Sequence, residues 1–571
     1  MERNKCALMA MIILMAISTL LHAQTDPPIS TEGKKFYVSF GSNLNKADDE
    51  MNLRFIIKIV ATKPTKTRLY YFANKLEEDA AQTKLVRTAD LRNTSKVKLV
   101  YSPKTGTSFK SLRIESDDPV SVYVLNEYTA SADATNILPV TSLGTNYYHA
   151  SYKPMTEGST IHSDGYTVVA TEDNTIVYEN GVQKATLDEG EVYSNYIQST
   201  DMTGRHITST KPIAYFVTNS GAIVPEGLNA KTGSVDCLFQ QIPPVDMWGS
   251  RYLVPVTTQG KERVRVIATS DDTHITYTVG VDKSAVSSPL KAGQFMELEI
   301  TKESTVNGAY ITSDKPVGVF SYLEGCLNIG ATNNVGDPSI SWIAPLDQAL
   351  NRTTITPFIS TTNDYTENYA IVITPTATKD YTKVFKDTEI TGTSLSGGTW
   401  KDNLNSGFSY YIMPLKGATA DDCYTFANDA GLFVQSYGTG KAVSYYYLGG
   451  SALYNINTAF FVNDIHYQKT AGESFCPDVA IQAELNNLDN TKSGYLKWYI
   501  DGVEEISARD NEKKWNKNLK PGSHTIRMDV TNTLGTIQSV QTTITVIQCS
   551  SGNDNDAPKL LPINPGIFFT R

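Results

Sequence analysis

The chain of 571 residues is 40% hydrophobic and 19% charged, a composition typical of folded domains and not of disordered chains. This length is too great for one hydrophobic core, so we expect several domains or a repeat array. The formal net charge of −10, without a lysine or arginine stripe, argues against a nucleic-acid partner. Tyrosine is abundant, at 32 residues, and aromatic side chains favour strands.

The N-terminus has the pattern of a secretory signal peptide over residues 1–23. Two basic residues precede the short apolar run Ala7–Leu21, and Ala23 is a small residue before the polar stretch that begins at Gln24. The run is short for a bilayer span, and a retained anchor is the alternative. Position 24 is not cysteine, so we expect no N-terminal lipid. We expect the mature chain to be secreted, extracellular or at the cell surface, without a membrane span.

A motif of the form I-x-S-x-x-P-V recurs without gaps at Ile114–Val120, Ile207–Ile213 and Ile311–Val317. The prolines of successive copies are 93 and 104 residues apart. Repetition at a fixed spacing is the sequence signature of a repeat architecture. Each copy therefore marks one unit of about 100 residues.

Two further signatures recur in the same order. Pro139–Gly144, followed by Tyr147, matches Pro244–Gly249, followed by Tyr252, and Pro345 begins a weaker third copy. Strands that end in threonine form the other signature, at Thr62, Thr171, Thr269 and Thr374. We therefore predict about four β repeats, each of about 100 residues, across residues 33–450.

The second repeat is predicted to hold seven short strands. An Asn-Gly step at Asn180 indicates a hairpin, and Pro212 is placed at the first residue of the last strand. This density of strands suits a small β-sandwich, which we favour, or paired propeller blades, which are the alternative. The expected strands are Tyr147–Tyr152, Thr167–Thr171, Thr175–Tyr178, Gln183–Leu187, Glu191–Ile197, His206–Ser209 and Ile213–Thr218.

The segment Glu324–Ser339 is the predicted ligand-binding loop, because it is rich in Gly and Asn and has no close counterpart in the other repeats. A crossover linker that packs on a neighbouring repeat is an equal alternative. Aromatic anchors often dominate binding surfaces. The candidate ligand residues are Tyr322, Asn328, Asn333, Asn334 and Trp342. Trp248 and Gly249 are predicted to be structural, the first in the core and the second in a turn with positive φ.

Residues 459–549 form a separate module, predicted to be an immunoglobulin-like sandwich around a buried Trp498. Cys476 and Cys549 lie at its two ends and are predicted to form a disulfide, because export permits disulfides. A weaker prediction joins Cys237 to Cys326, which lie at comparable positions one repeat apart. Residues 550–571 are expected to form a polar linker and an apolar tail.

The sequence nominates no catalytic residue, cofactor or metal ligand. It lacks zinc-protease histidine pairs, a nucleophile elbow, a phosphate-binding loop and a dinucleotide fingerprint. Asn553–Asp556 is acidic but lacks the glycine and the distant glutamate of a calcium loop. Paired carboxylates for glycoside hydrolysis meet only in space, and nothing in the sequence nominates a pair. We therefore expect a protein that is not an enzyme.

The run Asp236–Gly249 resembles the signature of the IgGFc-binding protein N-terminal domain family. Ile311–Phe320 is similar to the same family, as is Gly336–Ser339 leading to Trp342. The resemblance covers roughly residues 33–450, and the last module is similar to the PKD or immunoglobulin-like modules of bacterial surface proteins. The family takes its name from mucus-associated animal proteins that bind antibody Fc, and its bacterial members are generally extracellular, with no catalytic residues assigned. This chain departs from the family's paired cysteines, with one cysteine in each crossover segment.

These observations predict an adhesin-like binding protein that recognises extracellular glycoproteins, with mucin or immunoglobulin as the type of ligand. A structural component of an extracellular layer or matrix is the alternative. A glycan hydrolase is a third and weaker hypothesis.

Overall fold

The computed structural model describes residues 30–549 with internal gaps, so the predicted signal peptide, the tail 550–571, Asn553–Asp556 and Asn333 lie outside the described residues. The chain divides into two compact units, Met1–Asn457 and Thr458–Arg571. The gaps are 45–51, 83, 93–94, 230, 280–282, 303–306, 331–333, 361–362, 454–458, 468–469, 471–472, 485–495, 506–512 and 532–536.

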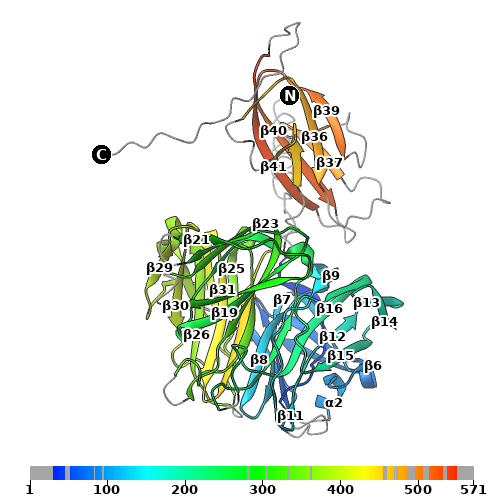
Figure 1. The fold of residues 1–571 in the computed structure, drawn as a ribbon, viewed down its shortest axis with the longest axis vertical. Coiled ribbons are helices and arrows are strands. Elements are labelled where there is room, and N and C mark those ends of the chain that lie inside the picture. The colour runs from blue at the N-terminus through cyan, green and yellow to red at the C-terminus, as the bar shows by residue number, and fades with distance from the viewer. Residues whose placement is uncertain are drawn as a thin grey trace, which may run out of the picture. The chain divides into compact units, whose positions relative to one another are not determined.

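The first unit is built of strands, as predicted, and each of its four large sheets corresponds largely to one repeat (Figure 1). The first repeat contains β1 (Gly33–Val38), β2 (Arg54–Ala61), β3 (Thr65–Tyr71), η1 (Phe72–Asn74), β4 (Leu76–Gln82), β5 (Val86–Asp90), α2 (Val97–Val100), β6 (Gly106–Ser108), β7 (Leu112–Tyr128) and β8 (Ser131–Ile137). The second contains η2 (Val140–Ser142), β9 (Gly144–Tyr148), β10 (Thr156–Glu157), β11 (Thr160–Ile161), β12 (Ser163–Ala170), β13 (Thr175–Glu179), β14 (Val182–Leu187), β15 (Val192–Gln198), β16 (His206–Ala222) and β17 (Asp236–Gln241).

The other two repeats follow the same order. The third contains η3 (Val245–Met247), β18 (Gly249–Val254), β19 (Lys261–Ala268), β20 (Ile275–Val279), β21 (Lys283–Val286), β22 (Phe295–Thr301), β23 (Ala309–Leu323) and β24 (Ser339–Ile343). The fourth contains η5 (Leu346–Gln348), β25 (Leu350–Ile355), β26 (Tyr365–Pro375), η6 (Thr376–Tyr381), β27 (Lys383–Lys386), β28 (Thr393–Ser394), β29 (Trp400–Asn403), β30 (Phe408–Pro414), β31 (Tyr424–Gly440) and β32 (Val443–Gly450).

One long strand organises each repeat: β7, β16, β23 or β31. The N-terminal half of β16 pairs with β9 and β13, and its C-terminal half pairs with β12 and β17. The prediction of two strands separated at Pro212 is wrong, because β16 runs through the proline. Its register against β9 shifts between Thr208 and Ile213, so the missing proline N–H falls where the ladder is interrupted.

The sequence signatures are explained by contacts at this shift. The Ser209 hydroxyl donates to the Lys211 carbonyl at 2.7 Å, and Thr171 Oγ1 donates to the Pro212 carbonyl at 2.6 Å. In the third repeat, Thr269 Oγ1 donates to Pro316 O at 2.7 Å in the same way. The serine, the proline and the strand-ending threonine thus recur together because they form one bonded group.

The predicted hairpin at Asn180 is confirmed, with φ of 49° at Asn180 and 77° at Gly181 between β13 and β14. Trp248 is confirmed as core, but the positive φ expected at Gly249 is wrong, because this glycine begins β18. The equivalent Gly144 shows why the position needs glycine. A Cβ there would lie 2.7 Å from the Cβ of Pro244, so Gly144 of one proline–glycine signature contacts the proline of the next.

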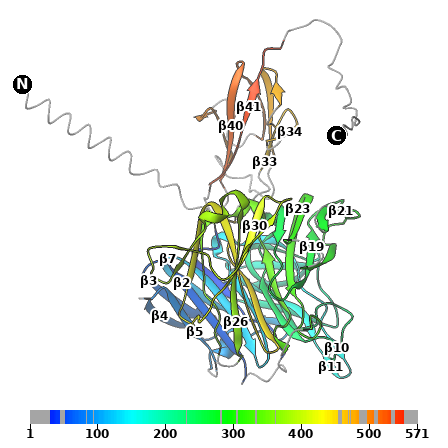
Figure 2. The same ribbon diagram turned by 90° about the vertical axis from the view of Figure 1, so that its left-hand side faces the viewer.

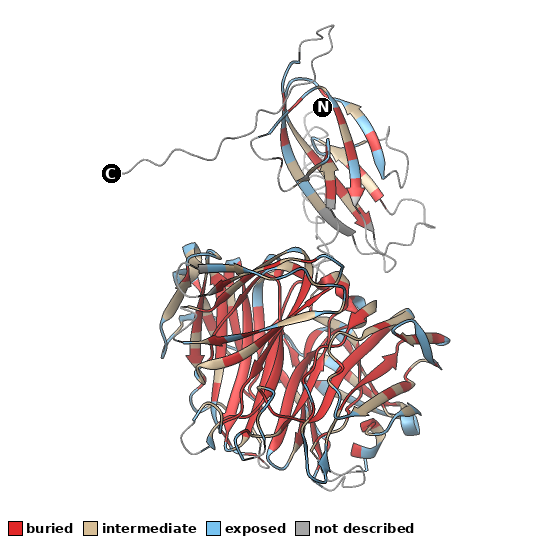
Figure 3. Ribbon diagram, viewed as in Figure 1, coloured by how far each residue is buried: buried red, intermediate tan, exposed pale blue. Residues whose placement is uncertain are grey.

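The last strands of the repeats, β8, β17, β24 and β32, contact one another in a closed ring. β8 packs against β17 and β32, and β24 packs against the same two strands. One hydrophobic core continues from the first repeat into the fourth, and Figure 3 shows the strands of this unit as largely buried. The repeats therefore share a large core, beside a smaller cluster between the first and fourth repeats and another within the third repeat.

The ring closes between the first and fourth repeats, which lie next to each other in Figure 2. The Thr31 N–H donates to Ser451 O at 3.0 Å. The Tyr123 hydroxyl lies within hydrogen-bonding distance of Thr354 O and Gly449 O. The buried Lys58 ammonium reaches the fourth repeat as well. Both ends of the repeat array are fixed by these contacts.

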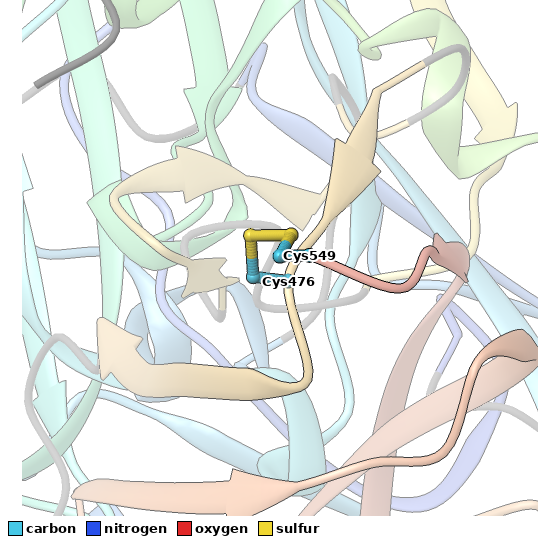
Figure 4. Close-up of a disulfide and its surroundings, with 2 residues drawn as sticks. All are labelled: Cys476 and Cys549. Atoms are coloured by element: carbon cyan, nitrogen blue, oxygen red, sulfur yellow. A yellow bond between two sulfur atoms is a disulfide. The ribbon is translucent and has the colours of Figure 1, made fainter. Parts of the chain in front are cut away.

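The second unit consists of two sheets around one core that includes Trp498, which is buried as predicted. The predicted disulfide between Cys476 and Cys549 is confirmed, with a Cα–Cα distance of 5.6 Å (Figure 4). The strands are β33 (Ala459–Val462), β34 (Ile465–His466), β35 (Ser474–Phe475), β36 (Asp478–Glu484), β37 (Leu496–Ile500), β38 (Val503–Glu504), β39 (Lys514–Asn518), β40 (Gly522–Thr531) and β41 (Ile537–Val546).

Candidate functional site

The two aromatic residues proposed as anchors of a ligand loop are core residues, so that prediction is wrong. Tyr322 is 0% exposed and Trp342 is 1% exposed. The Tyr322 hydroxyl donates to Ser151 O at 2.9 Å, and Trp342 pairs with Phe320 inside the ring. The chain enters and leaves the segment through buried strands, and these aromatic side chains fill the core there.

The segment between these strands packs on a neighbouring repeat. The Asn328 amide donates to the buried carboxylate of Glu324, which also binds Arg263. Asn334 is exposed, but its carbonyl accepts from the Ala442 N–H at 2.8 Å. These contacts fit the crossover alternative better than a free ligand loop.

The predicted bond between Cys237 and Cys326 is wrong, because both are free and buried. Cys237 is the second residue of the inner strand β17, whereas Cys326 lies in the crossover before β24, so the two positions are not equivalent. Cys423 is also free and buried. Burial, helped by Asp387, raises the pKa of its thiol to about 12, so a thiolate nucleophile is disfavoured there.

The centre of the ring holds a polar group that the sequence analysis missed. Asp133, on β8, is fully buried, and its carboxyl accepts hydrogen bonds from the N–H groups of Ala134, Phe239, Ile340 and Tyr446. Each of these four N–H groups comes from a different inner strand. Burial nevertheless raises the pKa of Asp133 well above its usual range.

The most exposed apolar side chains of the described residues lie in one part of the fourth repeat. Tyr381, Ile390 and Leu404 are 74%, 95% and 87% exposed. All three belong to residues 376–404, which we call the outer segment. The second and third repeats have a turn followed by a short hairpin after the strand-ending threonine, whereas here Pro375 and the helix η6 follow Thr374.

Two shallow depressions lie beside residues 394–398 of the outer segment. The first contains two aromatic side chains, Trp400 and Tyr411, next to Lys379 and Asp380. The second is lined by Met413, Pro414, Leu415 and Tyr424, with the charged residues Lys386 and Glu389. Tyr411, Met413, Leu415 and Tyr424 are largely buried and belong to a hydrophobic cluster of the first unit, so the two depressions are shallow hollows above that cluster.

Within the described ranges, no group of three or more His, Cys, Asp or Glu side chains is arranged to hold a metal ion. No helix of these residues is long and apolar enough to cross a membrane.

Comparison with known proteins identifies one family. The sequence model of the IgGFc binding protein family matches residues 133–438, just over half of the chain. A human protein named IgGFc-binding protein is 23% identical over 347 residues, which are 58% of this chain and 6% of that protein. The chain therefore spans only a small part of the length of this relative.

Solved structures give weaker similarities. The native conformation of E. coli alpha-2-macroglobulin matches with a TM-score of 0.18 and 10% identity, covering 92% of this chain and 40% of that chain. A Ca²⁺-stabilised, ice-binding adhesin of an Antarctic bacterium matches with a TM-score of 0.11 and 11% identity, covering 75% of this chain and 94% of that chain. At these TM-scores neither similarity supports a conclusion about fold or function.

Proposed function

Because this chain belongs to the IgGFc-binding protein family, we propose that it is an exported, adhesin-like protein that binds extracellular glycoproteins and catalyses no reaction. The human relative is named IgGFc-binding protein, and this name supports an antibody Fc region as the type of ligand. The N-terminal sequence pattern supports export.

The outer segment of the fourth repeat is the proposed binding surface. The observation that carries this assignment is the exposure of Tyr381, Ile390 and Leu404 in one segment beside two depressions. Large apolar side chains are costly to expose, and three of them within one segment of 29 residues favour a surface that a partner covers. The segment also breaks the repeat pattern, so its residues are not needed for the contacts that every repeat shares.

Binding of the purified full chain to immobilised mucin and immunoglobulin tests the proposal. The triple variant Tyr381→Ser, Ile390→Ser, Leu404→Ser should lose at least about tenfold in affinity, because a few buried anchors dominate protein interfaces. The matched control is the double variant Val182→Ser, Val286→Ser, which removes side chains that are 61% and 63% exposed in the second and third repeats.

The control should bind like the wild type, and all three proteins should have the same melting temperature. Equal loss of binding in the triple and control variants would contradict the assignment of the surface. A wild-type chain that binds neither ligand but assembles into large oligomers in sedimentation would favour the structural-matrix alternative.

A further inference from the structure

Four polar residues converge at one end of the inner ring. Ser131, Asp236 and Asp337 each lie eight residues before the proline of the next signature. The Ser131 hydroxyl donates to Asp236 Oδ1 at 2.5 Å, and the Asp337 N–H donates to Ser444 Oγ at 2.8 Å. Each of the four repeats thus supplies one residue to this cluster, which we call the axial cluster.

Two carboxylate oxygens of the axial cluster lack a partner. Asp236 Oδ1 accepts from Ser131 and from the N–H groups of Ala132 and Cys237, but Asp236 Oδ2 is buried without a hydrogen bond. Asp337 Oδ1 is buried without one as well. Buried polar atoms are almost always paired, so unpaired oxygens in one cluster indicate a missing ligand.

A third oxygen without a partner lies beside them. The hydroxyl of Tyr365 is buried and makes no hydrogen bond. Tyr365 pairs with Gly440, whose carbonyl accepts from the N–H of Gly336, the residue before Asp337. The register of the fourth repeat therefore places the backbone of Tyr365 next to the axial cluster, and its phenol lies within the electrostatic reach of Glu127 and Asp236.

The charges of the cluster are not balanced by the protein. Asp236 and Asp337 are 0% and 1% exposed, so water does not solvate either carboxyl. Within the described residues, no lysine or arginine forms an ion pair with either carboxyl. Two buried carboxylates are stable as anions only beside a cation.

We propose that the axial cluster binds one Ca²⁺ ion between Asp236 Oδ2 and Asp337 Oδ1. Oxygen-only ligands select hard cations, and Ca²⁺ accepts the irregular geometry that two side chains and one phenol offer. Waters or carbonyl oxygens complete the shell. The two carboxylates match the charge of the ion, so binding removes the electrostatic cost of the cluster and joins the second repeat to the third.

The test uses the full chain, freed of metal with EDTA. Adding Ca²⁺ at about 100 times its Kd should raise the melting temperature of the first unit by about 5 °C. Asp236→Asn and Asp337→Asn should each abolish this shift. The matched control, Asp429→Asn, changes an exposed aspartate and should keep it.

Terbium luminescence excited through tyrosine supplies a second readout that needs no carboxylate variant. Wild type should give saturable emission that Ca²⁺ displaces, and Tyr365→Phe should lower it. A melting temperature that Ca²⁺ does not change would overturn the proposal. If Asp337→Asn is then also as stable as the wild type, the carboxyl groups of the cluster are neutral acids and need no cation. If the aspartate variants do not fold, the absence of displaceable emission in wild type decides against the site.

Discussion

Replacing Trp248 with alanine should destabilise the first unit more than most single substitutions. The indole is fully buried where the second and third repeats meet, and its Nε1 donates to Pro243 O at 3.1 Å. Removing a buried tryptophan ring costs about 3–5 kcal/mol, and the unpaired carbonyl adds about 1 kcal/mol. We expect the free energy of unfolding to fall by about 4–6 kcal/mol.

A second substitution tests whether packing causes this loss. A Cβ on Gly318 would lie 2.5 Å from the Trp248 ring, so Gly318→Ala alone should cost about 1–3 kcal/mol through overpacking. In the Trp248→Ala background the same methyl group enters the space that the ring has left. The two costs should therefore not add, and the coupling energy should be about 1–3 kcal/mol.

Urea denaturation of the wild type, both single variants and the double variant measures this coupling, with far-UV circular dichroism as the signal. The transition of the second unit, which contains neither residue, is the internal control. Costs that add within about 0.5 kcal/mol would refute the packing argument, since residues that do not touch behave additively.

Two further predictions concern the disulfide and Lys58. Reducing the Cys476–Cys549 bond, which spans 73 residues, should destabilise the second unit by about 4 kcal/mol and leave the melting transition of the first unchanged. Burial lowers the pKa of Lys58 from 10.5 to about 7, so the folded state binds fewer protons than the unfolded state between these values. The stability of the first unit should therefore rise from pH 7 to about pH 9, and Lys58→Met should remove this rise.

Each of these two predictions has a clear contrary outcome. A second unit that melts at the same temperature with and without dithiothreitol would show that the disulfide adds no stability. A pH slope that persists in Lys58→Met would assign the effect to other groups that titrate in this range.

The repeats could be predicted from the sequence because the residues of each signature are joined to one another by hydrogen bonds. The Thr171 to Pro212 hydrogen bond and its copy at Thr269 and Pro316 use the same residue types at the same spacing. Such local constraints leave a visible pattern. The Cys476–Cys549 disulfide was predictable for a similar reason, since it encloses one module of a chain that the sequence predicts to be exported.

The inner ring left no such pattern. Strand β8 reads Ser-Ala-Asp-Ala-Thr-Asn-Ile, a polar run that resembles a loop, because its side chains bond to the other inner strands instead of filling an apolar core. For the same reason, the alternation of apolar and polar residues did not indicate that the side chains of Tyr322 and Trp342 point into the core. The outer segment was also missed, although Pro375 after Thr374, where the second and third repeats have a turn and a hairpin, was a visible departure from the repeat.

The closure of the ring sets an order on how this chain can fold. The Ser451 N–H donates to the Thr31 hydroxyl across 420 residues. Contacts between such distant residues form late, because the loop between them must first be ordered. During synthesis, the side of β8 that contacts β32 stays uncovered until the fourth repeat has been made. In a fragment that ends after the second repeat, this side of β8 would stay uncovered and could pair with strands of other chains.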